Sequence, residues 1–117
     1  LGLLALHAGA ARVFAIDDSP MIEVARETLV RAGFEGQATF VRGRSQSVKL
    51  PERVDLIVCD HVGYFGFDYD ILHLLQDARQ RFLKPHGEVI PRRISLTAAV
   101  VESTPARSKV EAWREQS

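Results

Sequence analysis

Blocks of apolar residues separated by short polar turns continue to about residue 91, and each block predicts a helix or a buried strand. Leucine and alanine dominate residues 2–9, so we expect a short helix that stops at Gly9. The unbroken apolar run 13–16 ends at Asp17 and predicts a strand that is buried on both faces.

A second helix is expected between Ser19 and Gly33. Serine is a preferred N-cap, Pro20 suits the first helical position, and Gly33 provides a stop signal. An apolar face repeats within this stretch at helical spacing, formed by Met21, Ile22, Ala25, Leu29 and Ala32.

Two more strands and a third helix follow. Strands are expected at 38–41 and at 54–59, and the second of these leads directly into Asp60. A loop at 43–46 separates them. The stretch 70–82 predicts a helix, because apolar residues recur on one side at three- and four-residue spacing: Ile71, Leu74, Leu75, Ala78 and Phe82.

The pattern changes after that helix. A turn at 84–87 leads to a strand at 88–91, and residues 94–102 predict a further strand. Residues 103–108 are expected to form a polar connection, and a helix is expected to start around Trp113.

Strands that alternate with helices across short turns predict an α/β fold, with a parallel sheet, right-handed crossovers and helices on both faces. Because this alternation stops near residue 92, we expect one domain at 1–91 and the start of another at 92–117.

Charge and hydropathy narrow the range of partners. Fifteen basic and fifteen acidic side chains cancel, so no net field favours nucleic acid, an anionic membrane or an acidic substrate. The Arg92 and Arg93 pair has no interleaved aromatic residues, which disfavours a nucleic-acid platform. The longest apolar run falls far short of the roughly 20 residues that span a bilayer. We therefore expect neither nucleic acid nor a membrane as partner.

The single cysteine, Cys59, excludes an internal disulfide framework and favours a reducing, cytoplasmic location. His7 and His73 lack the spacing of metal ligands, so no metal is expected. His61 lies in a candidate pocket loop, but it has no evident serine or cysteine partner for nucleophilic catalysis.

Asp17 is the first candidate site residue. Ligands of parallel sheets bind beyond the carboxyl ends of the strands, where this carboxylate could accept hydrogen bonds from the ribose of a nucleoside cofactor. Alternatively, Asp17 and Asp18 only place negative charge near the following helix N-terminus, which stabilises by about 0.3–1 kcal/mol. A glycine-rich turn should accompany a cofactor site, yet no Gly-x-Gly occurs. Because the sequence starts at Leu1 in the middle of an apolar helical pattern, we expect the glycine-rich turn to lie upstream of Leu1.

The loop at 59–70 is the second candidate, because polar groups and glycines after a buried strand could line a substrate pocket. A carboxylate at Asp60 could hold a cationic substrate or accept its proton. Asp68 and Asp70 are further catalytic candidates. The alternative for both is capping of the next helix.

Five stretches carry a shared pattern: 9–17, 43–51, 54–60, 63–65 and 78–91. Together they resemble the protein arginine methyltransferases, and the likeness covers residues 1–102. It implies a partial Rossmann-like, class I methyltransferase fold that binds S-adenosylmethionine, with a β-barrel substrate domain beginning after residue 91. It also implies a parent that could be a homodimer, whose first, central strand and glycine-rich motif lie upstream of Leu1.

The resemblance also assigns residues by position. Asp17 matches the acid that binds the ribose, while Ser45 and Gln46 match the pair that contacts adenine, with Gln46 in place of an acid. The full cofactor-binding set expected in this way is Asp17, Asp18, Gly43, Ser45, Gln46 and Ile71.

Asp60 matches the first of two glutamates that grip the substrate guanidinium in this family, and the second falls on Tyr69. Asp68 and Asp70 flank that position, but neighbouring helical residues point about 100° apart, so neither substitutes without a change of register. This departure leaves open whether the methyl acceptor is a protein or a small molecule.

Three functions therefore stay open. The first is a methyltransferase whose acceptor is a nitrogen or oxygen nucleophile, and the second, motivated by Tyr69, is an inactive binding or dimerisation module. The third is a nicotinamide-dependent oxidoreductase, which the proline-containing segment after 70–82 and the Gly63–Tyr64 loop disfavour. For the 117 residues alone we expect no catalysis, poor cofactor affinity and aggregation, because a sheet without its middle strand exposes unpaired edges.

Overall fold

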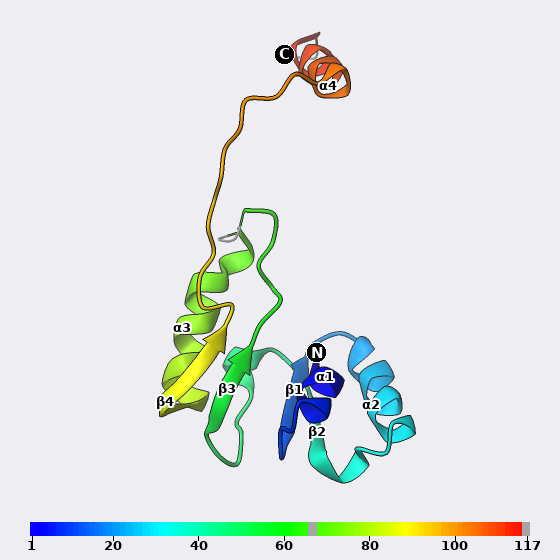
Figure 1. Cartoon of the computed structure of the whole chain (residues 1–117), viewed down its shortest axis with the longest axis vertical. Coiled ribbons are helices and arrows are strands. Elements are labelled where there is room, and N and C mark those ends of the chain that lie inside the picture. Colours follow the sequence, from blue (N-terminus) through cyan, green and yellow to red (C-terminus); the bar gives the residue numbers. More distant parts are fainter. Residues whose placement is uncertain (66–67, 116–117) are drawn as a thin grey trace.

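The computed structural model of the chain describes residues 1–65 and 68–115. Gly66, the second glycine of the candidate substrate loop, and residues 116–117 lie outside the described residues. In chain order the helices and strands are α1 (Gly2–His7), β1 (Val13–Asp17), α2 (Met21–Arg31), β2 (Ala38–Arg42), β3 (Val54–Val58), α3 (Ile71–Phe82), β4 (Leu83–Ile90) and α4 (Thr104–Glu115), as Figure 1 shows. The described residues also form the short 3-10 turns η1 (Glu35–Gln37), η2 (Ser45–Ser47) and η3 (Asp68–Asp70). The expected helices and strands up to residue 91 are confirmed, although β4 begins earlier than expected.

The strands form two parallel sheets of two strands each. In the first sheet β1 pairs with β2, and Asp17 lies opposite Arg42. In the second sheet β3 pairs with β4, with a register shift between Val54 and Leu56. The predicted parallel arrangement is confirmed, but the described strands do not join into one sheet (Figure 1).

The turn expected at 84–87 is wrong, because these residues lie within β4, at the register shift. Leu83 pairs with Val54 and Glu88 pairs with Leu56, so the four residues between them bulge out of the ladder. Gly87 closes the bulge, because a Cβ there would lie 2.9 Å from the Asp55 carbonyl oxygen and closer still to the Leu83 side chain. Such an approach of two backbones admits only glycine.

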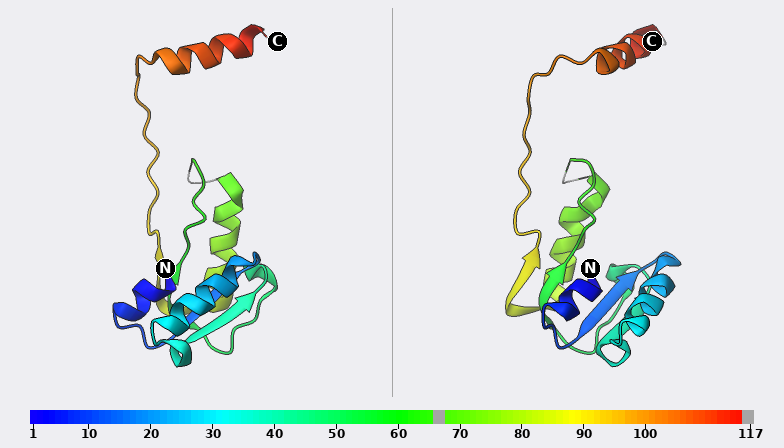
Figure 2. Two further views of the ribbon diagram at one scale, coloured as in Figure 1. Left: turned by 90° about the vertical axis from the view of Figure 1, so that its right-hand side faces the viewer. Right: turned by 45° about the vertical axis from the view of Figure 1, so that its right-hand side comes forward.

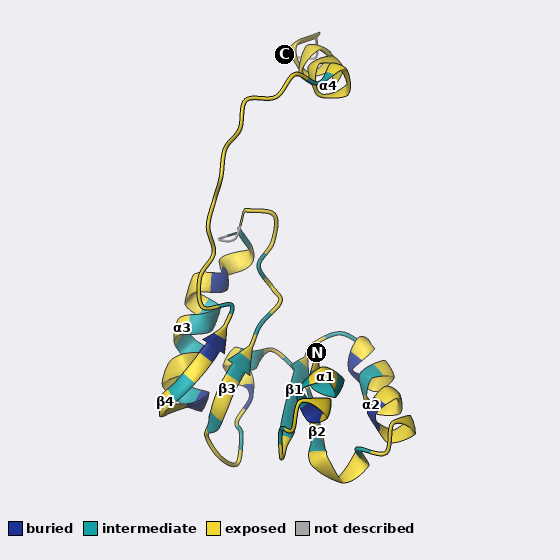
Figure 3. Cartoon of the chain, in the orientation of Figure 1, coloured by how far each residue is buried: buried dark blue, intermediate teal, exposed yellow. Residues whose placement is uncertain are grey.

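Each sheet is covered by a helix that follows from its sequence pattern. Ile22 and Leu29 are the buried residues of α2, which packs on the β1–β2 sheet. Ala78 and Phe82 are buried on α3, which packs on the β3–β4 sheet. Figure 3 shows buried positions on these two helices and also on α1 and β4.

The expectation that residues 13–16 are buried on both faces is wrong. All four residues of this run are half-buried, and none is fully enclosed. The reason is that β1 has a partner on only one edge, so its other edge does not exclude water.

The chain after residue 92 also differs from the prediction. The expected strand at 94–102 is wrong, since residues 93–103 have no regular secondary structure and form an extended arm that leads away from both sheets (Figures 1 and 2). The polar connection expected at 103–108 is wrong as well, because α4 begins at Thr104. The Ser103 hydroxyl accepts a hydrogen bond from the Ala106 N–H at 3.3 Å and caps this helix. A helix does include Trp113, but it begins at Thr104, so the start expected around Trp113 is wrong.

The arm sets the dimensions of the molecule. Its radius of gyration is 18.9 Å, with extents of 57 × 33 × 27 Å. A compact domain of this size would have a radius of gyration of about 13 Å. Within the described residues, no helix combines the length and the apolar character that crossing a membrane requires.

Candidate functional site

Asp17 ends β1 at the carboxyl edge of the first parallel sheet, as the apolar run 13–16 predicts. Its Oδ1 accepts a hydrogen bond from the Ser19 N–H at 2.7 Å, and the Ser19 Oγ accepts one from the Met21 N–H at 3.2 Å. Hydrogen bonds from the Ser19 hydroxyl and N–H lower the pKa of Asp17 below 3.8, while slight desolvation opposes them. The carboxylate is therefore exposed and ionised at neutral pH, and it also supports the start of α2.

The loop after β2 lies against this strand end. The Gly43 N–H donates to the Asp17 carbonyl oxygen at 3.0 Å, which extends the parallel ladder by one residue. The Arg44 Nε lies 3.5 Å from an Asp18 carboxylate oxygen. The next residues form η2, in which Ser45 is half-buried and Gln46 is exposed. The structure thus brings five of the six expected cofactor-binding residues to one edge of one sheet.

The sixth, Ile71, is placed differently. It is the first residue of α3 and has no exposed surface. It is therefore enclosed at the start of the helix that packs on the β3–β4 sheet.

A side chain from α3 anchors the loop after β2, and the sequence analysis missed it. The Arg81 guanidinium donates to the carbonyl oxygens of Val48, at 2.7 Å, and Ser45, at 2.5 Å. It also pairs with the Asp77 carboxylate at 2.6–3.0 Å. This hydrogen bonding lowers the pKa of Asp77 and raises that of Arg81. The four-residue spacing of Asp77 and Arg81 signals an ion pair on a helix, but it says nothing of the loop.

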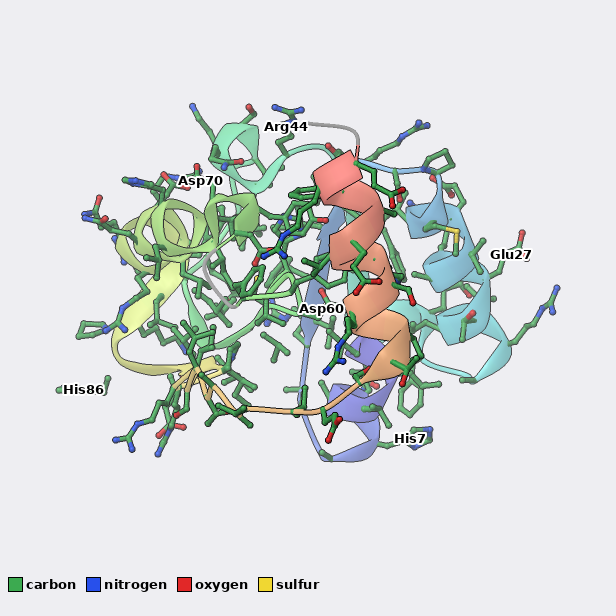
Figure 4. All side chains as sticks on the ribbon, turned by 90° about the horizontal axis from the view of Figure 1, so that it is seen from above. His7, Glu27, Arg44, Asp60, Asp70 and His86 are labelled. Carbon is green, nitrogen blue, oxygen red and sulfur yellow. The ribbon has the colours of Figure 1, made fainter. Side chains whose placement is uncertain are left out.

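Asp60 follows β3 at the carboxyl edge of the second sheet. The Cys59 N–H still donates to the Ile90 carbonyl oxygen at 2.8 Å, and the Val62 N–H donates to the Asp60 carbonyl oxygen at 2.8 Å, so the chain turns there. The Asp60 side chain is exposed. In the projection of Figure 4, Asp60 lies between the two halves of the molecule, and Arg44 and Asp70 lie toward one side.

The alternative that the Asp68 and Asp70 side chains cap the next helix is wrong. The Asp68 carboxylate accepts hydrogen bonds from the N–H groups of Tyr64, at 2.8 Å, and Phe65, at 3.0 Å, and closes the preceding turn. Asp70 occupies the N-cap position of α3 without a side-chain capping bond, and its Oδ1 lies 3.9 Å from the His73 Nε2.

The physical reason is an unusual backbone. Tyr69 and Asp70 have φ angles of 60° and 61°, in the left-handed region that non-glycine residues rarely adopt. This pair turns the chain sharply into α3. It also places the Tyr69 ring 5.3 Å from the ring of His61, measured between centroids, which brings the two ends of the loop together.

The remaining candidates stay outside this arrangement. His7 is exposed and makes an edge-to-face contact with Phe34 at 5.1 Å, while Cys59 is half-buried. Among residues 1–65 and 68–115, no group of three or more His, Cys, Asp or Glu side chains is placed to hold a metal. A hollow of about 430 Å³ has Arg53, Arg79 and Lys84 in its lining. Neither Asp17 nor Asp60 lines it.

Comparison with known proteins identifies relatives of this chain. No family model matches the chain. Over 115 residues, 97% of its length, the chain is 32% identical to protein arginine N-methyltransferase 1.1 of Arabidopsis thaliana and 30% identical to protein arginine N-methyltransferase 1 of Dictyostelium discoideum. These matches cover 30% and 34% of the two relatives, so the chain spans about a third of their length.

Solved structures give the same result. The Trypanosoma brucei PRMT1 enzyme–prozyme heterotetrameric complex with AdoHcy matches with a TM-score of 0.72 and 31% identity, covering 76% of this chain and 28% of that chain. Protein arginine methyltransferase 10 of Arabidopsis thaliana matches with a TM-score of 0.67 and 31% identity, covering 74% and 26%. The chain is therefore a relative of the protein arginine N-methyltransferases, matched to about a third of their length and with part of a Rossmann-like fold.

Proposed function

We propose that these residues form part of the donor-binding domain of an S-adenosylmethionine-dependent methyltransferase related to the protein arginine methyltransferases. One observation carries the proposal: an exposed, ionised Asp17 ends a parallel strand, with the loop 43–46 hydrogen-bonded alongside it. A carboxylate at such a strand end accepts hydrogen bonds from vicinal ribose hydroxyls. The Trypanosoma neighbour, whose structure contains AdoHcy, supports this assignment.

In this proposal the end of β1 and the loop after β2 bind different parts of the donor. Asp17 holds the ribose, while Ser45 and Gln46 face the adenine from the η2 turn. S-adenosylmethionine supplies an activated sulfonium methyl group, so the protein has mainly to align the acceptor and exclude water. We assign residues after 91 to the beginning of a second, substrate-binding domain.

Asp60 is the proposed acceptor-side carboxylate. It lies at the carboxyl edge of β3, exposed and next to the His61–Tyr69 contact, so it can orient a nitrogen nucleophile and take up its proton. Tyr69 offers a phenol where a second acid would form a bidentate clamp. We therefore propose a nitrogen acceptor on a protein or a small molecule, with arginine as one member of that class.

Tyr69 also favours a second candidate, a catalytically inactive binding or dimerisation module. Its φ of 60° and its contact with His61 fix a side chain without negative charge at this position. Transfer of a tritiated methyl group to arginine-rich peptides and to small amines, by the complete protein that carries this sequence, separates the two candidates. Robust turnover on any acceptor excludes the inactive module.

Binding of S-adenosylhomocysteine to that complete protein tests the donor site. Asp17→Ala should weaken binding by about tenfold or more, since hydrogen bonds to a charged group contribute about 1.5–3 kcal/mol. Asp55→Ala is the matched control, because Asp55 is an exposed aspartate that pairs with Lys84 on the other sheet. Equal affinities of Asp17→Ala and the unmodified protein would overturn the ribose assignment.

A further inference from the structure

We propose that Asp77 and Arg81 are positioning residues that hold the loop 45–48 in the shape required to receive the donor nucleoside. The inference rests on the proposed function, and it adds residues of α3 that never reach the ligand themselves. The helix α3 would thus contribute to donor binding although it packs on the β3–β4 sheet and the proposed donor site lies on the β1–β2 sheet.

The first step is the geometry of the guanidinium. Arg81 uses one edge for the Asp77 carboxylate, through Nε and Nη2, and the other for the carbonyl oxygens of Ser45 and Val48. A planar fork with five N–H donors can serve a carboxylate and two carbonyls at once, whereas an ammonium group cannot reproduce these directions. Asp77 therefore fixes the rotation of Arg81, and Arg81 fixes the two carbonyls.

The second step is the weakness of the loop without this anchor. Inside the turn, the Ser47 N–H donates to the Arg44 carbonyl oxygen at 2.9 Å, and the Val48 N–H donates to that of Ser45 at 3.2 Å. The Arg44–Asp18 ion pair is exposed and 3.5 Å long, and such pairs contribute little. A 3-10 turn of three residues has poorer hydrogen-bond geometry than an α-helix, so besides the buried Val48 side chain these contacts hold the loop only weakly.

The third step is the path of the connection. The loop belongs to the first sheet through β2, whereas Arg81 belongs to the helix that covers the second. No hydrogen-bonded strand joins the two sheets within the described residues. The guanidinium therefore ties the proposed adenine loop to the helix that packs on the other sheet.

Arg81→Lys tests the fork while keeping the charge. Amide hydrogen exchange of the complete protein that carries this sequence should become roughly tenfold faster in the segment 45–48, because opening of a local unit governs exchange there. Arg53→Lys is the matched control: the Arg53 guanidinium donates to the carbonyl oxygens of Gln80 and Leu83 at 3.0 and 2.6 Å, but does not touch the loop. Unchanged exchange at 45–48 in Arg81→Lys overturns the proposal, whatever the protein binds.

Donor binding provides the second readout, measured as S-adenosylhomocysteine affinity of the complete protein. Arg81→Lys and Asp77→Asn should each weaken it by roughly tenfold, with the KM of the methyl acceptor unchanged, because only the donor loop is displaced. An equal loss in Arg53→Lys would reduce the effect to general stability and overturn the inference, and so would full affinity in Arg81→Lys. If the unmodified protein does not bind S-adenosylhomocysteine, the proposed function fails. The hydrogen exchange at 45–48 then still tests, without any ligand, whether Arg81 holds the loop.

Discussion

Individual carboxylates at the ends of strands and turns were predictable to different degrees. Asp17 was placed correctly because an unbroken apolar run has to end at the rim of a parallel sheet, and this follows from local sequence. The role of Asp68 was not predictable. It depends on two consecutive left-handed residues, Tyr69 and Asp70; aspartate is enriched in that conformation, but tyrosine is not, and nothing in the sequence signals two such residues in a row.

Gly63 shows how the Asp68 turn depends on a single residue. Its φ is +62°, and an added Cβ would overlap the Asp68 carboxylate that accepts the N–H groups of Tyr64 and Phe65. Gly63→Ala should therefore lower the free energy of unfolding by about 2 kcal/mol, through backbone strain and the displaced carboxylate. Chemical denaturation measures it. Gly36→Ala, with open space around the added methyl group, is the control, and an equal effect of both changes would contradict the prediction.

Stability should fall in acid because of Asp17 and Asp77. Both carboxylates have pKa values lowered from 3.8 in the folded chain, so the unfolded chain binds more protons in that range. Their stabilisation is fully present above pH 3.8 and is lost as the pH falls through the lowered values. Between pH 2 and 7, the denaturation midpoint of Asp77→Asn should fall less steeply with acid than that of the unmodified chain. An equally steep fall would count against a stabilising Asp77–Arg81 ion pair. Glu27→Gln, which removes an exposed carboxylate beside Arg31, controls for the loss of charge.

The helix faces and the strands at unbroken apolar runs were predictable, whereas whether a further strand-like run finds a partner was not. The faces of α2 and α3 follow from three- and four-residue spacing, which any helix must satisfy. The run 94–102 has strand-like composition, but no described strand lies beside it to supply backbone partners, so it stays extended. In contrast, the start of α4 was signalled locally by Ser103 and Pro105 and was overlooked.

The packing of α2 gives a prediction at this scale. Ile22 is 2% exposed, whereas Val24 on the same helix is 52% exposed. Ile22→Ala should lower the free energy of unfolding by about 2 kcal/mol or more, because it leaves a cavity beneath the helix. Val24→Ala should change it by less than about 0.5 kcal/mol. Urea titration followed by circular dichroism distinguishes the two, and similar losses would argue against the packing described for α2.

At the scale of the whole molecule, the parallel topology was predictable and the anchoring of one half to the other was not. Alternating strands and helices imply parallel pairing through general rules of connection. The Arg81 contacts to Ser45 and Val48 bridge more than thirty residues, and no periodicity reports such a contact. The resemblance to a known family supplied the expected roles of Ser45 and Gln46, which composition and spacing could not.

The open edges of β1 and β3 predict self-association of the 117-residue chain. Unpaired N–H and C=O groups lie there, and Leu56 and Val58 of β3 are 42% and 41% exposed. Light scattering should give an apparent mass above 13.0 kDa that rises with concentration. A monomer that melts cooperatively at every concentration would contradict this expectation.

The extended arm has a consequence for handling the protein. Proteases cut where several residues can be drawn into an active site in extended form, and residues 93–103 already have that form. Arg92 and Arg93 are exposed at its base, so brief trypsin treatment should cleave there first and separate α4 from the two sheets. The cores beneath α2 and α3 would survive that cut, because α4 contributes no buried residue to them.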